Sequence, residues 1–247
     1  MELIVLNTGS HSNGYILNCD NEALFIECGR HYAEAIKAIS HDRRKVVGCI
    51  VTHEHGDHAR YINEYLNAAV PVWATAGTSG ALRHAGKLKS TFQPHECAAR
   101  KMFTPGGFEI TPFTVEHDAV EPVGFHIWHR EMGSVVFATD TMSLKERFEP
   151  PTHVMIECNY TDEALTANRR LPSTVKDRVR SSHMSLAGCK EALKRMNLTS
   201  CRNIILIHLS DDNSEEDRMV EEVFSATGKP TFAATATQHY DFNLKPF

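Results

Sequence analysis

At 247 residues and 42% hydrophobic content, the chain can bury a large core, and with no linker, low-complexity tract or repeat it is expected to form a single domain over residues 1–247. The formal net charge of −5 excludes a uniformly basic nucleic-acid-binding surface, but not a local basic groove. Because no apolar run approaches the roughly 20 residues of a membrane span and no signal-peptide pattern opens the chain, we expect a cytoplasmic protein without membrane contact.

The first third of the sequence predicts three strands joined by tight turns, at residues 2–7, 15–19 and 23–27. A helix over residues 31–40 leads into an apolar strand that ends at Val51. A second helix is expected over residues 57–66, followed by a strand at 70–74, a helix at 79–85 and an irregular segment.

From Gly107 onward the β pattern resumes, with strands expected at residues 108–116, 123–129, 134–139 and 153–157. The last third is rich in helix, and it is expected to contain helices at 161–169, 172–180, 185–196 and 214–227 and strands at 203–207 and 230–235. Strands in both halves, with helices between them, predict two sheets packed face to face and covered by helices.

The seven cysteines are scattered along the chain and include no C-x-x-C pair. An odd number without pairing argues against a disulfide framework and fits a reducing compartment. Cys28, Cys49 and Cys158 lie in apolar strand patterns, so we expect small core residues rather than catalytic thiols.

A metal-ligating pattern follows the strand that ends at Val51: H-x-H-x-D-H, formed by His53, His55, Asp57 and His58. Neutral imidazoles and a carboxylate suit zinc, manganese or iron better than calcium or magnesium. A solvated, His-rich turn is the alternative. It is disfavoured because the strand delivers the cluster to a strand end, where open α/β sheets place their sites.

Three more residues with metal-binding side chains, His117, Asp140 and His208, each follow a predicted strand. Taken singly, each could be a surface histidine, a helix cap or a capped strand end. Together with the H-x-H-x-D-H motif they predict a binuclear hydrolytic site, in which two ions lie about 3.5–4 Å apart.

These residues resemble the metallo-β-lactamase superfamily over nearly the whole chain. The resemblance implies an α/β (α+β) fold, the four-layer αββα sandwich of the metallo-β-lactamase type. It also implies that one ion takes His53, His55 and His117, that the other takes Asp57, His58 and His208, and that Asp140 bridges them. The chain departs from the superfamily at Glu27, where aspartate is usual, although a carboxylate is retained.

The residues around these ligands narrow the resemblance. Asp140 stands where the zinc β-lactamases carry a cysteine, so lactam cleavage is not expected. The string H-D-A-x-x-P-V-G-F at residues 117–125 and the segment 7–15 resemble the YycJ/WalJ-like branch, whose assigned activity is a 5′-to-3′ DNA exonuclease. S-H-M-S at 182–185 and I-H-L-S at 207–210 are similar to the paired motifs of RNase Z and its relatives.

In those nucleases the first histidine of the pair meets the scissile phosphate and the second binds metal. His183 is therefore expected to serve as a general acid or phosphate contact, because an imidazole titrates near operating pH. The alternative is that His183 merely caps the helix that begins near Ser185. Asp57 and His183 are the two residues assigned catalytic roles.

The resemblance implies a metallo-hydrolase, namely a phosphodiesterase or nuclease whose nucleophile is a hydroxide bridging two divalent ions. Zinc and manganese are the expected ions and iron is also compatible. DNA is favoured over RNA as the substrate, and a homodimer is left open. Two basic stretches, residues 83–101 and 169–180, could contact phosphates or be solvated helix faces. The rival functions are a metal-dependent hydrolase of a small ester, thioester or lactone, which would need an apolar pocket, and a non-enzymatic metal-binding module.

Overall fold

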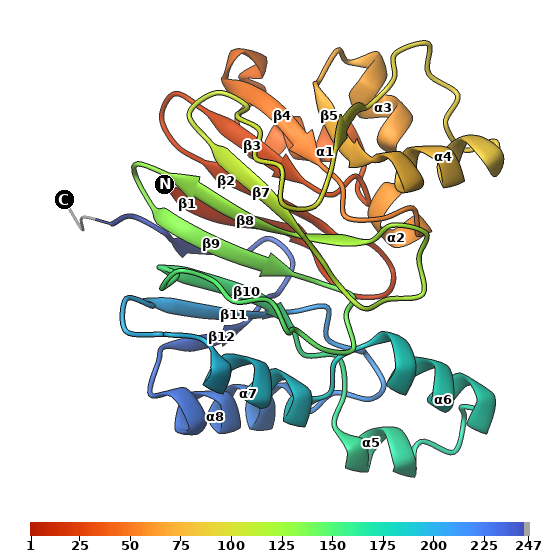
Figure 1. Ribbon diagram of the computed structural model, residues 1–247, viewed down its shortest axis with the longest axis vertical. Helices are drawn as coiled ribbons and strands as arrows, with labels where there is room; N and C mark the ends of the chain where they lie inside the picture. The colour runs from red at the N-terminus through yellow and green to blue at the C-terminus, as the bar shows by residue number, and fades with distance from the viewer. Residues whose placement is uncertain (245–247) are drawn as a thin grey trace.

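Two β-sheets packed face to face form the centre of the computed structural model, which describes residues 1–244 (Figure 1). Within these residues the first sheet has the strand order β13 (His239–Asp241), β1 (Glu2–Asn7), β2 (Gly14–Asn18), β3 (Ala23–Ile26), β4 (Val46–Ile50), β5 (Val72–Thr75) and β6 (His95–Cys97). The second has the order β12 (Thr231–Ala233), β11 (Asn203–Ile207), β10 (His153–Glu157), β9 (Gly133–Ala138), β8 (Val123–His129) and β7 (Glu109–Thr114).

Helices cover the outer face of each sheet (Figure 1). The first sheet carries α1 (Tyr32–Ala38), α3 (Ile62–Asn67) and α4 (Ala76–His84), and the second carries α7 (Leu186–Arg195) and α8 (Glu216–Thr227). The shorter or more exposed helices α2 (Gly56–Ala59), α5 (Asp162–Ala167) and α6 (Ser173–Ser182) lie along the right-hand side of Figure 1, α2 in its upper half and α5 and α6 in its lower half. The resulting order, helix, sheet, sheet, helix, is the four-layer α/β sandwich that the sequence predicts.

Three apolar clusters hold these layers together. The central one joins the facing sides of both sheets, where Tyr15 of β2 meets Phe137 of β9 edge to face with ring centroids 5.5 Å apart. An outer cluster packs α3 onto the first sheet through Tyr65 and Phe25. Full burial of each large apolar side chain contributes roughly 1.5–3 kcal/mol to the stability of the fold. Because the strands are apolar on both faces, each sheet is stable only when it is covered on both sides.

The helix predicted over residues 57–66 is wrong, because the structure has two short helices there, α2 and α3. The backbone N–H of Tyr61 donates to the Cys28 carbonyl at 2.9 Å, and the Asp57 carbonyl accepts from Asn13 N–H at 2.7 Å. These hydrogen bonds to other segments replace the backbone bonds of a continuous helix.

The short edge strands β6 and β13 were not predicted. Each has three mostly polar residues without a strand pattern, and they become strands only by pairing with β5 and β1.

Cys28, Cys49 and Cys158 are buried, as predicted, and all seven cysteines are free. Among residues 1–244, no helix is both long and apolar enough to cross a membrane.

His153, at the opposite end of β10 from Glu157, is fully buried, and its ring stacks on Phe242 with centroids 4.0 Å apart. Its Nε2 atom has no hydrogen-bond partner among the described residues. Burial is the main reason that the pKa of His153 is lowered to about 4; the Phe242 backbone and the Asp241 carboxylate oppose this shift, and Arg202 adds to it. The folded protein therefore holds this histidine neutral under mildly acidic conditions.

Acidification is expected to destabilise the protein through His153 by up to roughly 3 kcal/mol. The unfolded chain takes up this proton near pH 6.5 and the folded chain only near pH 4. Titration of His153 therefore has no effect on the free energy of unfolding above pH 6.5, and it lowers that free energy progressively as the pH falls from 6.5 to 4. His153→Gln should flatten the pH dependence of urea unfolding between about pH 7 and pH 4. The exposed His84→Gln variant is the control and should keep the wild-type slope. Equal slopes for His153→Gln and wild type would contradict the prediction.

Candidate metal centre

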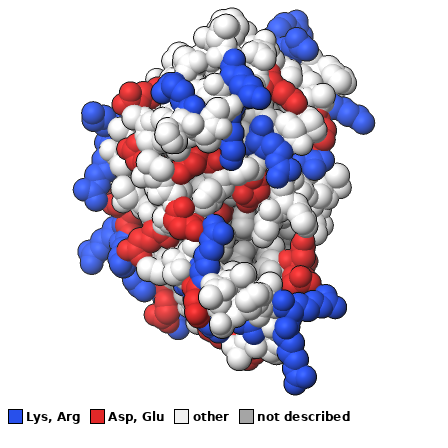
Figure 2. All heavy atoms as spheres, turned by 90° about the vertical axis from the view of Figure 1, so that its right-hand side faces the viewer, with Lys and Arg blue, Asp and Glu red and all other residues white. Residues whose placement is uncertain are grey.

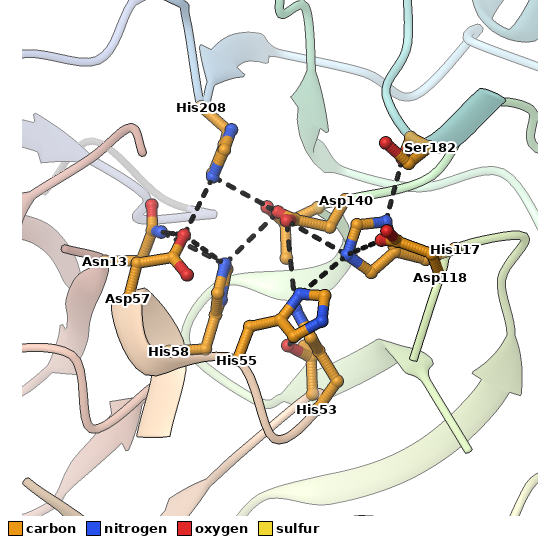
Figure 3. Close-up of polar contacts among 12 residues, drawn as sticks. Asn13, His53, His55, Asp57, His58, His117, Asp118, Asp140, Ser182 and His208 are labelled. Atoms are coloured by element: carbon orange, nitrogen blue, oxygen red, sulfur yellow. Dashed lines mark hydrogen bonds and ion pairs between the residues drawn. The ribbon is translucent and has the colours of Figure 1, made fainter. Parts of the chain in front are cut away.

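The predicted ligands gather at one edge of the two sheets. Strands β9, β10 and β11 are parallel, and β7 runs in the same direction because β8 is antiparallel to both of its neighbours. Their carboxyl ends therefore meet at one edge, where His117, Asp140 and His208 follow β7, β9 and β11. Strand β4 of the first sheet ends at the same place and delivers the H-x-H-x-D-H segment (Figure 3).

The structure brings all seven predicted ligands together in two groups that share Asp140. One group is His53, His55, His117 and Asp140, and the other is Asp57, His58, Asp140 and His208. Within each group, one ligand atom from every residue lies within 4.8 Å of the others. The grouping matches the division between two ions that the superfamily resemblance implies.

Asp140 lies at the centre of this arrangement (Figure 3). Its Oδ1 atom is 3.3 Å from His58 Nε2 and 3.4 Å from His208 Nε2, and its Oδ2 atom is 3.5 Å from His117 Nε2. Each oxygen thus faces a different group. Asp140 and His208 leave their strands with φ of 43° and 55°, in the left-handed region that non-glycine residues rarely adopt, and this turn aims both side chains across the edge.

Neighbouring polar groups fix which ring nitrogens face the centre. His117 Nδ1 donates to the Ser182 carbonyl at 2.8 Å, which leaves Nε2 to point at Asp140. His53 Nδ1 lies 2.9 Å from the Thr52 hydroxyl, which itself donates to Glu27 at 2.6 Å. Such outer contacts hold an imidazole in the tautomer that a metal needs.

The retained carboxylate of Glu27 supports the ligand loop even though aspartate is usual there. Glu27 is buried, accepts hydrogen bonds from Thr52, and places Oε1 3.3 Å from His58 Nδ1. Asn13, to which sequence reasoning gave no role in the site, donates to Asp57 Oδ2 at 3.2 Å and lies 3.1 Å from His58 Nε2.

These residues fit a divalent ion. His53 Nε2 is buried and has no hydrogen-bond partner within residues 1–244, although it faces the cluster 3.8 Å from Asp140. A buried, unpaired acceptor costs roughly 1–3 kcal/mol, a cost that coordination would remove. The donor set of imidazoles and carboxylates is the one that zinc, manganese and iron accept.

Electrostatics in the cluster favour ionised carboxylates. Burial opposes ionisation of Asp140, but His208 and His58 outweigh it and hold the pKa of Asp140 well below its usual range. The pKa of Asp57 is also lowered despite burial, chiefly by His58. Burial lowers the pKa of His53 well below its usual range, and His58 adds to the effect. Anionic oxygens and neutral imidazoles are the forms that bind metal. Against burial, Asp140 raises the pKa of both His58 and His208, so metal binding at these two imidazoles would release protons.

Glu157 is the most informative residue that sequence reasoning missed. It is fully buried, and its Oε2 atom accepts the backbone N–H of Thr141 at 2.8 Å. Its Oε1 atom is 2.6 Å from His183 Nδ1 and 3.5 Å from His208 Nδ1. The missed signal was a charged residue closing the apolar run of β10, the same strand-end pattern that identified Asp140 and His208.

His183 lies beside the ligand cluster. Its ring is stacked on that of His208 with centroids 5.3 Å apart, and its side chain is 20% exposed. Burial would lower the pKa of His183, but Glu157 outweighs it and raises the pKa to about 9. The helix-cap alternative is wrong, because the Ser185 hydroxyl caps α7 by accepting the Gly188 N–H. His183 also falls within 4.8 Å of Asp140, Glu157 and His208.

Half of the ten arginines and lysines of the two basic stretches bind other groups of the protein through their side chains. Arg178 donates to Asp118 at 2.9 Å beside His117, Arg180 lies 3.5 Å from Asp177, and Lys176 bonds the Thr166 carbonyl. In the first stretch, Arg83 binds Gln93 and Arg100 reaches Glu146. In the described part of the chain no side-chain partner is found for Lys87, Lys89, Lys101, Arg169 and Arg170, so only part of each stretch is held within the protein.

Gly29 allows three backbone segments to meet under the ligand loop. A Cβ atom added there would lie 1.9 Å from the Asp57 carbonyl oxygen and 2.5 Å from that of Asn13. Backbone atoms cannot yield as a flexible side chain would, so the segment that carries Asp57 and His58 would have to move.

Gly29→Ala is therefore expected to reduce the metal content per chain and to destabilise the protein by about 2 kcal/mol or more. Gly80→Ala on α4 is the matched control, since nothing lies within 4 Å of its added Cβ. Alanine is favoured in a helix, so the control should gain about 0.5–1 kcal/mol. Elemental analysis and urea unfolding measure both variants, and a Gly29→Ala protein with wild-type metal content would contradict this account.

Comparison with known proteins places this geometry in context. Residues 26–209, which include all seven candidate ligands together with Glu157 and His183, match the family described as the β-lactamase superfamily domain. The chain is 28% identical over 223 residues to the exodeoxyribonuclease YycJ of Bacillus anthracis, covering 86% of this chain and 84% of that protein. It is 28% identical over 226 residues to the exodeoxyribonuclease WalJ of Streptococcus pneumoniae, covering 85% and 82%.

Among solved structures, the metallo-β-lactamase fold protein YhfI of Bacillus subtilis superposes with a TM-score of 0.72 at 17% identity, covering 97% of this chain and 99% of that one. This likeness concerns the fold, and it agrees with the four layers seen here.

Proposed function

The chain belongs to the metallo-β-lactamase superfamily, and we propose that this metal-dependent hydrolase is a nuclease that cleaves DNA in preference to RNA. We further propose 5′-to-3′ exonuclease action. The similarity to proteins named exodeoxyribonuclease supports the substrate class. The cytoplasmic location and a homodimer stay predictions.

His53, His55 and His117 would hold one divalent ion, Asp57, His58 and His208 would hold the other, and Asp140 would bridge them. Such a pair of ions supplies a hydroxide nucleophile near neutral pH and neutralises charge that builds on the non-bridging phosphate oxygens. Zinc and manganese are the proposed ions and iron is also compatible. Asp140 would bridge the two ions through its two carboxylate oxygens, which face different ligand groups.

The observation that carries the proposal is the pairing of His183 with Glu157 at 2.6 Å beside His208. A departing sugar oxygen needs a proton, and a partly exposed imidazole at the edge of the cluster can deliver it. Glu157 holds Nδ1, so Nε2 is the atom left to meet the substrate. Hydrolysis of a small ester or lactone has less need of such a donor at this position.

The proposal is tested with protein purified without added metal and analysed for its element content. The protein is then assayed on DNA and RNA strands labelled at either end. We expect about two ions per chain and stepwise release of mononucleotides from the 5′ end of DNA. Internal cuts would overturn the exonuclease assignment. Hydrolysis of p-nitrophenyl acetate or a lactone, with both nucleic acids left intact, would overturn the nuclease itself.

A further inference from the structure

A basic groove adjoins the metal motif on the side of α2, α3 and α4. It encloses about 520 Å³ and is lined by residues of the metal-binding turn and of the segment after α4: Glu54, Gly56, Ala59, Arg60, Lys87 and Lys89. The ligands His53, His55, Asp57 and His58 alternate with lining residues of the same turn. The groove and the metal centre therefore share one short stretch of backbone.

Three cations of this groove are free of internal partners within residues 1–244. Arg60, Lys87 and Lys89 are exposed, and in the described part of the chain none of their side chains forms an ion pair or hydrogen bond. This distinguishes them from Arg178 and Arg100, which bind carboxylates. Figure 2 shows several Lys and Arg side chains on the upper part of this face, with Asp and Glu side chains among them.

The carboxylate that lines the groove, Glu54, is partly satisfied by the backbone. Glu54 Oε1 accepts the Val120 N–H at 2.8 Å. Against three cations this leaves a local excess of positive charge within a protein whose net charge is −5. A concave surface of this sign attracts a polyanion.

The segment that carries both lysines is held rigidly. Asn63 of α3 donates to the Lys87 carbonyl at 2.7 Å and accepts the backbone N–H of Lys89 at 2.7 Å. Gly86, at φ 66°, ends α4 and allows this turn. Both ammonium groups therefore project from a fixed backbone, which lowers the entropic cost of binding.

We propose that this groove binds the phosphate backbone of the substrate strand next to the scissile bond. The assignment rests on the proposed nuclease function and deepens it, since it makes the substrate a polymer longer than the single phosphodiester that the metal centre contacts. The lining residues include no aromatic ring, so the contacts are to phosphates and are independent of base sequence.

The test compares Lys87→Gln/Lys89→Gln with Lys194→Gln/Arg195→Gln, which removes the same charge from the surface of α7. For each metal-loaded enzyme, kcat/KM is measured on single-stranded DNA, on RNA and on bis-p-nitrophenyl phosphate, which is too short to reach the groove. The ratio of the DNA to the bis-p-nitrophenyl phosphate value should fall about tenfold in the groove variant, mainly through KM. The slope of log kcat/KM on DNA against the logarithm of the salt concentration should become less steep by about 1.4, roughly 0.7 for each lost phosphate contact.

Wild-type ratios and salt slopes in the groove variant, or an equal fall in the α7 variant, would overturn the groove assignment while the nuclease function stands. A wild-type enzyme that hydrolyses bis-p-nitrophenyl phosphate but neither DNA nor RNA would instead overturn the function, and the groove assignment with it. The RNA arm shows whether the groove accepts both sugars, as phosphate contacts alone would allow.

Discussion

Replacement of Asp140 by asparagine is expected to abolish metal-dependent cleavage of both bis-p-nitrophenyl phosphate and single-stranded DNA, by roughly a thousandfold or more. The asparagine would keep the shape of the side chain but not its charge or its second anionic oxygen. Because Asp140 is the one residue common to both ligand groups, the loss should also lower the metal content below two ions per chain.

Asp211→Asn provides the control for this variant. Asp211 lies three residues after His208 on the same loop, but its side chain is 76% exposed, and within residues 1–244 its one ion pair is with His11. The control should keep wild-type activity and metal content. Substantial activity in Asp140→Asn would remove the two-ion mechanism, since no other carboxylate among the described residues belongs to both groups.

The second large effect is expected from His183→Ala. If His183 protonates the leaving oxygen, DNA cleavage should slow by about 10²–10⁴-fold. Hydrolysis of bis-p-nitrophenyl phosphate should slow much less, because nitrophenolate departs as a stable anion without a proton. The ratio of the two losses therefore separates proton donation from a general disturbance of the site.

The metal content of His183→Ala decides between two roles. His183 approaches Asp140 and His208 closely enough to join a third ligand group. Two ions per chain in the variant would agree with a proton donor, whereas the loss of one ion would show that His183 is a ligand. Equal losses on both phosphate substrates with full metal content would contradict the proton-donor assignment.

Glu157→Gln offers an independent check on the same role. Glutamine can still accept the N–H bonds of Thr141 and Met184, but it removes the charge that faces His183 and His208. A positioning role predicts a loss that follows that of His183→Ala, larger on DNA than on bis-p-nitrophenyl phosphate. A merely structural role would affect both substrates alike.

The sequence by itself predicted the four layers and the seven candidate ligands, because both follow from patterns within short stretches of the chain. Apolar runs of strand length predict the sheets, and a histidine or aspartate placed directly after such a run predicts a side chain at a strand end. His117, Asp140 and His208 are separated by more than twenty residues each, yet parallel strands bring their exits to one edge.

Only the tertiary structure decided which neighbours complete the site. The role of Glu157 depends on contacts with His183 and His208, which are 26 and 51 residues away along the chain. The tight packing at Gly29 and the break between α2 and α3 come from backbone bonds that join Asn13, Cys28 and the metal-binding turn. Whether a lysine or arginine pairs internally or stays available to a ligand is likewise set by what packs beside it. Such pairings depend on distances between remote segments, which residue order and periodicity do not specify.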